Sequence, residues 1–533
     1  MLTELTENLQ RTLPDAPLHP RITEIGEVIY VGDGVIRLQG LPTAHIDDVV
    51  DIETESGIVK ALILGLSGES IEAVVLGDYT SIRQGDIARS TQGVLQIQSG
   101  ESLLGRVIDV MGNPLDGKGP IKSSIWMPVE RQAPGVAKRE PVTQQLDTGI
   151  LVVDTIIPLG KGQRELIIGD RKSGKTTLME AFIMNQKGMD ITCIYVAIGA
   201  QKAKIRGLHQ RLEKAGAMDY TCIVVGSADE PPSNNWIAPY AGAAIGEWFM
   251  DHGKEAFVVF DDLSKHAKAY RQMSLLLKRS PGRDAYPGDI FYLHSRLLER
   301  TCRVNKGAGG GSLTGFPVAE TQNGDQSEYI VTNLMSITDG HIYLDINLMH
   351  EGIYPAVNSG ASVSRIGGSI QPPYLRKQGE LAGSIMARYN EVKSYETLNT
   401  EISEDTEREI KRGKRMLEIF AQELALSLRH DEKSILLYLV TSGRSDNIEL
   451  PDLRAIRVAM VDFYRAGKYD DLREKLFKDK DLDAISSMID LFFADYAASS
   501  PITAAQQLIK PKEAVEAPLP IVPDPKSAPD AHP

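Results

Sequence analysis

The stretch Leu166-Ile167-Ile168-Gly169-Asp170-Arg171-Lys172-Ser173-Gly174-Lys175-Thr176 decides the fold of this chain. An apolar run ends in the pattern G-x-x-x-x-G-K-[ST], and a segment of helical character, 177–182, follows it. This order predicts a strand, a phosphate-binding loop and a helix. The glycines let successive backbone N–H groups wrap a phosphate chain, and the helix presents its positive end to that chain. We therefore predict that Gly169 to Thr176 bind a nucleotide.

Side chains that contact phosphate and side chains that hold magnesium complete the predicted nucleotide site. Lys175 would reach the β- and γ-phosphates of ATP or ADP, and Thr176 would ligate Mg²⁺. A second apolar run, 256–260, ends at Asp261. A carboxylate at a strand end can hold the water shell of the magnesium ion, and this signal becomes specific beside a phosphate-binding loop. We therefore expect ATP or ADP, together with Mg²⁺, as cofactors.

Length and composition indicate an ordinary multidomain globular protein. The 533 residues are too many for one compact core. The apolar fraction of 42% and the charged fraction of 24% exclude the fibrous and disordered classes. With 72 acidic and 58 basic residues, the formal net charge of -14 argues against a nucleic-acid partner.

The sequence predicts a reducing compartment and no membrane anchor. The chain has three cysteines, an odd number, and they lie far apart in the sequence. We therefore expect Cys193, Cys222 and Cys302 to be reduced residues of the core. The first residues carry acids where a signal peptide needs bases, and no apolar run approaches the roughly 18 residues needed to cross a bilayer. Membrane contact is therefore expected only through partners.

Three regions with different patterns of apolar residues, and a proline-rich stretch after them, follow one another along the chain. Residues 1–95 contain short β-rich runs separated by glycine turns, which predicts an N-terminal β-barrel domain. Residues 96–370 alternate apolar strands with helical segments, which predicts a P-loop α/β domain with a mainly parallel sheet. Residues 371–500 repeat apolar positions three or four apart and are predicted to form an α-helical domain. The stretch 501–533 is predicted to be a proline-rich disordered tail.

One expected catalytic group is missing from the sequence. Hydrolysis needs a side chain that orients or deprotonates the attacking water, usually a carboxylate or a glutamine near the γ-phosphate. The expected place is the end of the strand after the first crossover helix, which reads Ile198-Gly199-Ala200-Gln201. Because no acid stands there, the site is predicted to bind nucleotide while turning it over slowly or not at all.

Several longer motifs resemble those of the α subunits of F-type ATP synthases, and the resemblance covers nearly the whole chain. In that family the catalytic β subunit carries a glutamate where this chain has Ala200 and Gln201. The resemblance therefore implies a non-catalytic, regulatory nucleotide-binding subunit. The motifs are Gly162-Gln163-Arg164-Glu165, Asp261-Asp262-Leu263-Ser264-Lys265, Pro281-Gly282-Arg283-Asp284-Ala285-Tyr286-Pro287-Gly288-Asp289 and Ser362-Val363-Ser364-Arg365-Ile366-Gly367-Gly368.

The resemblance also implies partners, residue roles and a location. Three such chains alternate with three β subunits around a central γ subunit, and a peripheral stalk holds the ring. Arg365 would reach into the neighbouring β site and stabilise charge on the transferring phosphoryl group. Ser362 is the serine that the family motif marks as required, and Gln422 corresponds to a glutamine at the nucleotide. The complex would lie at the cytoplasmic face of a bacterial inner membrane and couple ATP synthesis or hydrolysis to ion transport.

The chain departs from the family pattern at several positions. Lys172 and Ser173 stand where glutamine and threonine are usual, and Ala200 is an extra residue. Met349 and Tyr354 stand where an aromatic residue and an arginine are common. Only about twenty residues precede the predicted barrel. These features resemble an alternate-type bacterial copy of the subunit.

Other functional classes stay open at this point. A self-sufficient P-loop export ATPase would need its own catalytic glutamate. A Rho-like RNA helicase also combines a barrel with a P-loop domain, but it needs a basic face for RNA. A third possibility is a purely structural role, in which bound nucleotide only stabilises a ring of subunits. Against the helicase stands an acidic cluster in the predicted barrel, made of Asp47, Asp48, Asp51, Glu53 and Glu55.

Overall fold

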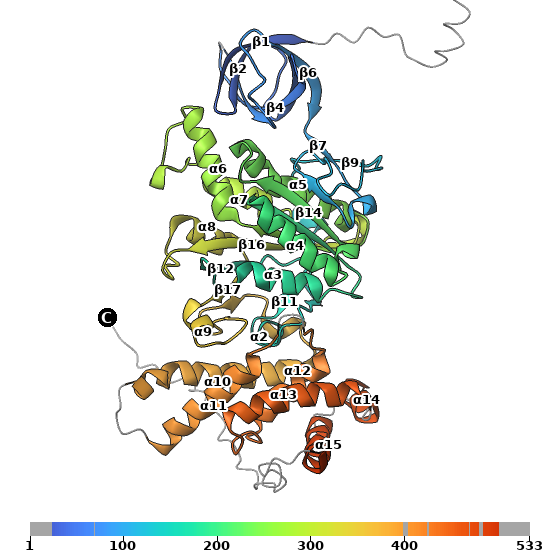
Figure 1. Cartoon of the computed structure of the whole chain (residues 1–533), viewed down its shortest axis with the longest axis vertical. Helices are drawn as coiled ribbons and strands as arrows, with labels where there is room; N and C mark the ends of the chain where they lie inside the picture. The colour runs from blue at the N-terminus through green and yellow to red at the C-terminus, as the bar shows by residue number, and fades with distance from the viewer. Residues whose placement is uncertain are drawn as a thin grey trace, which may run out of the picture.

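Three domains stack along the long axis of the molecule. The computed structural model describes residues 24–68, 70–397, 403–423, 426–467, 470–478 and 483–499. A β-barrel lies at one end, a nucleotide-binding domain in the middle and a helical domain at the other end (Figure 1). The predicted fold class and domain order are confirmed. The predicted tail, 501–533, lies outside the described residues.

Six antiparallel strands close into the barrel in the order β1-β2-β5-β4-β3-β6. Its interior is filled by apolar side chains such as Val28, Ile36 and Ile63, which are fully buried. In two of its strands, β3 and β6, charged residues stand among the apolar positions. The acids of β3 are paired across the barrel surface; Lys60 donates to Asp51 over 2.9 Å, for example. The strands are β1 (Ile25–Gly32), β2 (Val35–Gly40), β3 (Asp48–Thr54), β4 (Gly57–Leu66), β5 (Ile71–Leu76) and β6 (Ile87–Val94).

An eight-stranded sheet forms the centre of the nucleotide-binding domain, in the order β18-β17-β12-β16-β15-β13-β14-β8. Its neighbouring strands run parallel, except for the edge strand β18, which is antiparallel to β17. The predicted mainly parallel sheet is therefore confirmed. The strands are β8 (Val107–Asp109), β12 (Leu166–Asp170), β13 (Ile191–Ala200), β14 (Thr221–Ser227), β15 (Glu255–Asp261), β16 (Ser312–Thr321), β17 (Gly340–Leu344) and β18 (Val363–Ser364).

Helices cover both faces of this sheet, so successive strand residues are buried on opposite sides. On β13, Tyr195 packs in the same cluster as α3 and α4, whereas Val196 packs with α5 and α6. The helices are α3 (Lys175–Met184), α4 (Lys202–Lys214), α5 (Pro232–Asp251), α6 (Leu263–Leu276), α7 (Ile290–Leu298), α8 (Tyr329–Ile337) and α9 (Ile346–His350). Two small two-stranded sheets pair β7 (Gln96–Gln98) with β9 (Trp126–Pro128) and β10 (Gln145–Leu146) with β11 (Leu159–Gly160).

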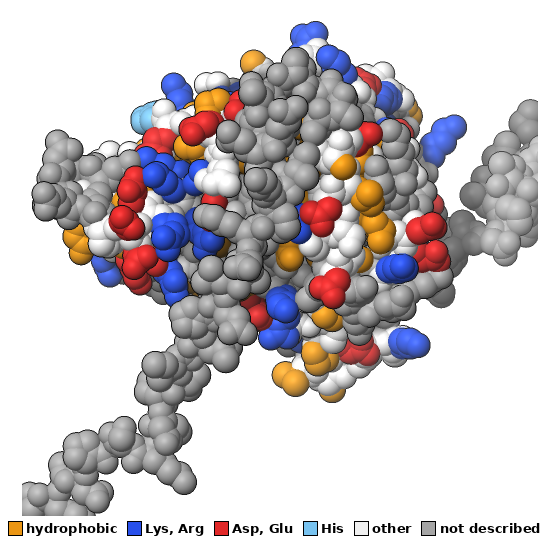
Figure 2. All heavy atoms as spheres, turned by 90° about the horizontal axis from the view of Figure 1, so that it is seen from below, with side chains coloured by type: hydrophobic (Ala, Val, Ile, Leu, Met, Phe, Trp, Pro, Cys, Tyr) orange, Lys and Arg blue, Asp and Glu red, His pale blue; other side chains and the backbone are white. Residues whose placement is uncertain are grey.

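The third domain is helical, as predicted. Seen from below in Figure 2, the described part of its outer face carries Lys and Arg side chains close to Asp and Glu side chains. Within the described residues, no helix combines the length and the hydropathy needed to cross a membrane. The helices are α10 (Pro373–Thr397), α11 (Glu404–Phe420), α12 (His430–Thr441), α13 (Leu450–Arg465), α14 (Asp470–Lys478) and α15 (Asp483–Ser499).

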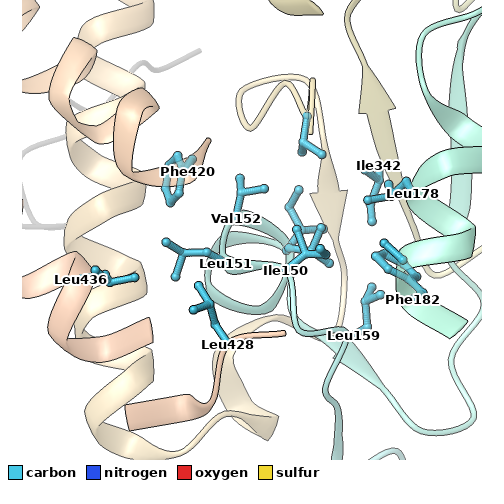
Figure 3. Packing of buried hydrophobic residues seen from close by; sticks show 14 of the residues in the cluster. Ile150, Leu151, Val152, Leu159, Leu178, Phe182, Ile342, Phe420, Leu428 and Leu436 are labelled. Atoms are coloured by element: carbon cyan, nitrogen blue, oxygen red, sulfur yellow. The ribbon is translucent and has the colours of Figure 1, made fainter. Parts of the chain in front are cut away.

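One short helix, α2 (Leu151–Ile156), joins the nucleotide-binding domain to the helical domain (Figure 3). Its side chains are almost completely buried, and its apolar residues belong to one continuous cluster. On one side of α2 lie Phe420, Leu428 and Leu436 of the helical domain. On the other side lie residues of the nucleotide-binding domain, among them Leu159, Leu178, Phe182 and Ile342.

A buried lysine crosses the same boundary. Lys433 of α12 is fully buried, and its ammonium lies 2.7 Å from the Asp154 carboxylate of α2 and in contact with Asp147. Burial alone would lower the pKa of Lys433, but the two carboxylates raise it, so the side chain stays charged. Asp154 also accepts bonds from the backbone N–H and the hydroxyl of Thr148, at 2.9 and 2.7 Å. Burial and the neighbouring Asp147 raise the pKa of Asp154 to about 8, whereas Lys433 holds the pKa of Asp147 below its ordinary value despite burial. The Lys433 ammonium is thus paired with the Asp147 carboxylate on removal from water.

Lys433→Ala should therefore destabilise the docking of the helical domain strongly. Removing one partner of a buried ion pair leaves an uncompensated charge and costs about 3–5 kcal/mol. Urea unfolding followed by circular dichroism measures the loss. Lys411→Ala is the matched control, because Lys411 forms an exposed pair with Glu407 one helical turn away, and such a pair contributes about 0.5 kcal/mol or less. Equal unfolding midpoints for the two variants would refute the role of Lys433.

Candidate nucleotide-binding site

The predicted phosphate-binding loop lies between β12 and α3. Its backbone turns through left-handed conformations at Lys172 and Gly174, with φ values of 67° and 97°. Gly174 directly precedes α3, which begins at Lys175, so the helix N-terminus opens onto the loop. Arg171 and Lys172 are exposed, whereas Ser173 is buried beneath the loop. The loop thus has the backbone needed to present N–H groups to phosphate.

The loop lysine is held above the loop by main-chain oxygens. The ammonium of Lys175 donates to the carbonyl oxygens of Gly169 and Asp170, each over 2.7 Å. Burial lowers the pKa of Lys175 from 10.5, while nearby carboxylates, Glu320 first among them, act in the opposite direction. A bound phosphate chain would supply a stronger counter-charge than these carbonyl groups.

Asp170 anchors the loop rather than lining the cleft. Its carboxylate accepts bonds from the hydroxyl of Thr321 and the backbone N–H of Gly324, at 2.7 and 2.8 Å. These bonds fix the end of β12 to the end of β16. Any contact of Gly169 or Asp170 with a nucleotide would come from the main chain.

The residues predicted to hold magnesium lie together. The Thr176 hydroxyl donates to Oδ2 of Asp261 over 3.0 Å, and the Tyr195 hydroxyl is bonded to the same oxygen. Burial and the neighbouring Asp261 raise the pKa of Tyr195 well above 10, so the phenol remains a proton donor. Oxygen ligands from a hydroxyl and a carboxylate suit Mg²⁺, which also takes ligands from water and phosphate. The residues present therefore fit the expected metal.

The loop opens into a cleft of about 880 Å³ that is lined by two chemically different sets of side chains. The apolar wall can receive a nucleotide base; it consists of Leu344, Met349, Tyr354, Pro355 and Ala356. Cationic side chains suited to phosphates come from the loop and from α3, α4 and α6; these are Arg171, Lys172, Lys175, Lys204, Arg211, Lys265 and Lys268. This division of chemistry matches a nucleoside phosphate.

A β-bulge lies where the sequence analysis looked for a catalytic acid. The register between β13 and β14 shifts between Ile198 and Ala200, so Gly199 is the additional residue of the bulge. The Gly199 N–H donates to Asn235 Oδ1 over 2.8 Å, which fixes the bulge to α5. Beyond it, Ala200 and Gln201 line the cleft. The bulge and the residues after it bring no carboxylate into the cleft.

One residue of the cleft was missed by the sequence analysis. Glu320, near the end of β16, lines the cleft and favours the charged form of Lys175. The signal was present, because the apolar run 313–319 ends in this acid beside the strand of the phosphate-binding loop. Its placement depends on β16 pairing with β12, which the sequence alone does not specify.

The two residues predicted to be catalytic lie outside this cleft. Arg365 follows the edge strand β18 and is exposed, and its backbone N–H donates to Asp339 O over 2.9 Å. The Ser362 hydroxyl donates to Asn358 O at 2.7 Å and accepts from the backbone N–H of Tyr343 at 2.9 Å. Ser362 thereby fixes the segment leading to Arg365 against β17.

Gln422 also lies apart from the cleft lining. Its side-chain oxygen accepts from the backbone N–H of Leu151 over 2.9 Å, and its amide nitrogen donates to Gly149 O over 2.7 Å. Its own backbone N–H donates to Tyr354 O over 2.7 Å, so it is linked to the apolar wall through the main chain. Direct contact between its amide and a nucleotide remains a prediction, and it would require the bonds to α2 to break.

Together the parallel sheet, the phosphate-binding loop and the Thr176–Asp261 pair define a P-loop nucleotide-binding protein. Protein-family models divide the chain in the same order. The beta-barrel domain of the ATP synthase alpha/beta family matches residues 22–92, and its nucleotide-binding domain matches 149–364. The C-terminal domain of the ATP synthase alpha/beta family matches 371–492.

Individual relatives are similar over most of the chain. A protein of Aquifex aeolicus named ATP synthase subunit alpha is 43% identical over 496 residues, which cover 92% of this chain and 97% of the relative. A protein of Lactococcus lactis subsp. cremoris with the same name is 45% identical over 461 residues, covering 86% of this chain and 91% of the relative. The chain therefore belongs to the family of ATP synthase alpha subunits.

Lys175→Ala should weaken nucleotide binding by about 10- to 100-fold, since hydrogen bonds to charged groups contribute about 1.5–3 kcal/mol. Titration with a fluorescent ATP analogue measures the dissociation constant. Lys187→Ala is the matched control, because this exposed lysine lies outside the cleft lining and its loss should leave the affinity almost unchanged. A Lys175 variant that binds like the unmodified chain would exclude the loop as the phosphate site.

Asp261→Asn should remove the advantage that magnesium gives to ATP binding. The amide is a weaker magnesium ligand than the carboxylate, while the hydroxyl of Thr176 keeps an acceptor at this position. Comparing ATP affinity with Mg²⁺ and with a chelator measures this difference. Asp219→Asn, at an exposed acid outside the cleft lining, should retain the full magnesium effect. Loss of the effect in both variants would argue against a role specific to Asp261.

Proposed function

We propose that this chain is the non-catalytic, regulatory nucleotide-binding subunit of an F-type ATP synthase. It alternates with three catalytic β subunits in a ring of six around a central γ subunit, and a peripheral stalk holds the ring. The complex synthesises or hydrolyses ATP in exchange for ion transport, at the cytoplasmic face of a bacterial inner membrane. Support comes from the relatives named ATP synthase subunit alpha, which match over most of the chain.

The chemistry of the cleft supports a site that binds Mg²⁺ and ATP or ADP without rapid turnover. Residues of the loop and the Thr176–Asp261 pair suit phosphate and metal. The end of β13 offers Ala200 and Gln201 and no carboxylate to activate water. Nucleotide held in this way would stabilise the subunit and its contacts.

The position of Arg365 is the observation that carries the proposal. β18 is antiparallel to β17, so the residue after β18 lies beside the start of β17, where Asp339 accepts its N–H bond. The phosphate-binding loop lies at the other end of the parallel strands. A five-residue strand such as β12 spans about 16 Å. Arg365 thus lies at the edge of the sheet opposite the chain's own phosphate-binding loop.

The environment of the Arg365 side chain fits a role in a neighbouring subunit. It is exposed, and within the described residues no hydrogen bond or ion pair engages its guanidinium. A guanidinium provides fixed donors for the oxygens of a transferring phosphoryl group. An arginine supplied in trans raises phosphoryl transfer by about 10³–10⁵. We infer that Arg365 completes the catalytic site of the adjacent β subunit.

One observation supports a second candidate function, that of a self-sufficient ATPase. Glu320 brings a carboxylate to the cleft, close enough to Lys175 to influence its charge. A self-sufficient ATPase could use such a group to orient water. Activity of the isolated chain therefore separates the two functions.

Arg365→Ala should lower ATP hydrolysis by the reconstituted ring by about 10³ or more, because charge stabilisation in the transition state is lost. Steady-state ATPase is measured for the chain alone, for the ring with the β subunit, and for the variant ring. Arg376→Ala is the matched control, since Arg376 is another exposed arginine and pairs with Glu380 on α10. Its ring should keep its activity.

Two results would contradict the proposal. Rapid hydrolysis by the isolated chain would favour the self-sufficient ATPase, and loss of that activity in Glu320→Gln would identify its carboxylate. Full activity in the Arg365→Ala ring would exclude the trans role of the arginine.

A further inference from the structure

The Asp261 carboxylate accepts hydrogen bonds from two hydroxyl groups that differ in burial. Those of Thr176 and Tyr195 both donate to the same oxygen, Oδ2. Thr176 is exposed in the first turn of α3, and it is also the residue predicted to ligate Mg²⁺. Tyr195 is only 2% exposed. The buried phenol is therefore the donor whose position is fixed by the fold itself.

Strand pairing explains why this phenol reaches the carboxylate. β13 and β15 are parallel neighbours, with Tyr195 opposite Val259 and Ala197 opposite Asp261. Residues two apart on a strand point to the same face of a sheet, so Tyr195, Ala197 and Asp261 share one face. The small side chain of Ala197 leaves space beside the carboxylate for the longer tyrosine. The tyrosine side chain thus extends along β13 toward the end of β15.

Apolar packing limits where the tyrosine ring can lie. Tyr195 belongs to the buried cluster that also contains Leu178 and Phe182 of α3 and Leu208 of α4. In an interior packed at this density, a side chain has few alternative positions. Tyr195 also lines the nucleotide cleft together with Asp261. A donor of fixed position therefore stands beside the carboxylate that is predicted to hold the water shell of magnesium.

The second oxygen of Asp261 is left for a ligand. Both printed donors act on Oδ2, and among the residues that the structure describes no group donates to Oδ1. Bonds to Oδ2 oppose rotation of the carboxylate, so Oδ1 keeps one orientation. Hydrogen-bond partners of metal ligands orient those ligands, and their loss typically lowers metal affinity by about 10- to 100-fold.

We propose that Tyr195 is a positioning residue for Asp261. Its hydroxyl holds Oδ2, so that Oδ1 stays available to Mg²⁺ or to the water shell of the ion. If Thr176 turns to serve as a metal ligand, Tyr195 remains as a donor that does not need to move. This inference rests on the proposed binding of magnesium with ATP or ADP. Tyr195 is not itself a ligand; its effect passes through Asp261.

Tyr195→Phe tests this role, because it removes the hydroxyl and keeps the ring that packs on β13. The measured quantity is the magnesium factor, the ratio by which Mg²⁺ tightens binding of a fluorescent ATP analogue relative to a chelator. We expect this factor to fall by about tenfold, toward the value of Asp261→Asn, since Thr176 still donates to Oδ2. Affinity in the chelator should change by less than about twofold, because the phosphate-binding loop is intact.

Tyr240→Phe is the matched control. It also removes a buried phenol hydroxyl, which donates to Leu293 O over 3.0 Å and lies outside the cleft lining. The control should keep the full magnesium factor. Urea unfolding of both variants, followed by circular dichroism, shows whether a loss of stability alone changes that factor.

A double-mutant cycle separates positioning from a general structural effect. In a chain that already carries Asp261→Asn, Tyr195→Phe should cause no further change in the magnesium factor, because the carboxylate through which it acts is absent. A structural effect would instead weaken nucleotide binding equally with Mg²⁺ and with the chelator.

The outcomes distinguish this proposal from the one on which it rests. An unchanged magnesium factor in Tyr195→Phe overturns the positioning role, while Asp261→Asn still reports on the metal site. An equal loss of affinity with and without Mg²⁺, or a further fall in the Asp261→Asn background, also overturns it. If Asp261→Asn keeps the full magnesium factor, the metal role of Asp261 fails, and the positioning role fails with it.

Discussion

The contact between helix α2 and the helical domain is the constraint on which the arrangement of the molecule depends. The apolar side chains of this short helix pack toward both domains, and its Asp154 is paired with Lys433 in a fully buried position. Breaking this contact would expose the apolar surface of both domains at once. The same segment leads directly into the sheet, since Pro158 O accepts a 2.9 Å bond from the hydroxyl of Ser364, next to Arg365. Domain docking and the placement of the arginine thus share one support.

The central sheet separates two functional positions by its geometry. Its carboxyl-terminal edge gathers the phosphate-binding loop, Asp261 and Glu320, as open parallel sheets commonly do. Its other edge carries Arg365, because the chain reverses direction in β18. A rigid sheet keeps these positions at a fixed separation. The nucleotide cleft therefore lies at one edge of the sheet and Arg365 at the other.

Local patterns predicted the parts of this structure that depend on neighbouring residues in the sequence. The phosphate-binding loop follows from its glycines and from the strand and helix beside it, and the Thr176–Asp261 pair follows from its strand end. The local sequence places Glu320 at a strand end, but its position in the cleft depends on β16 pairing with β12, which no local pattern specifies. The charged residues within β3 and β6 likewise weaken the local signal for those strands. Gln422 depends on the fold in the same way: the resemblance implies that it contacts nucleotide, which stays a prediction, and the structure shows its amide bonded to the backbone of Leu151 and Gly149.

The opposite placement of cleft and arginine also gives any assembly of this subunit a direction. Two copies related by a two-fold axis would present identical surfaces to each other, so an arginine could not meet a complementary site through that contact alone. Contacts that join one edge to the next subunit's other face are head-to-tail, and where the rotation between subunits closes they form a ring that has a direction. Around such a ring each subunit has a defined predecessor and successor. The clockwise and anticlockwise directions around the ring are therefore not equivalent for a conformational change that passes from one site to the next.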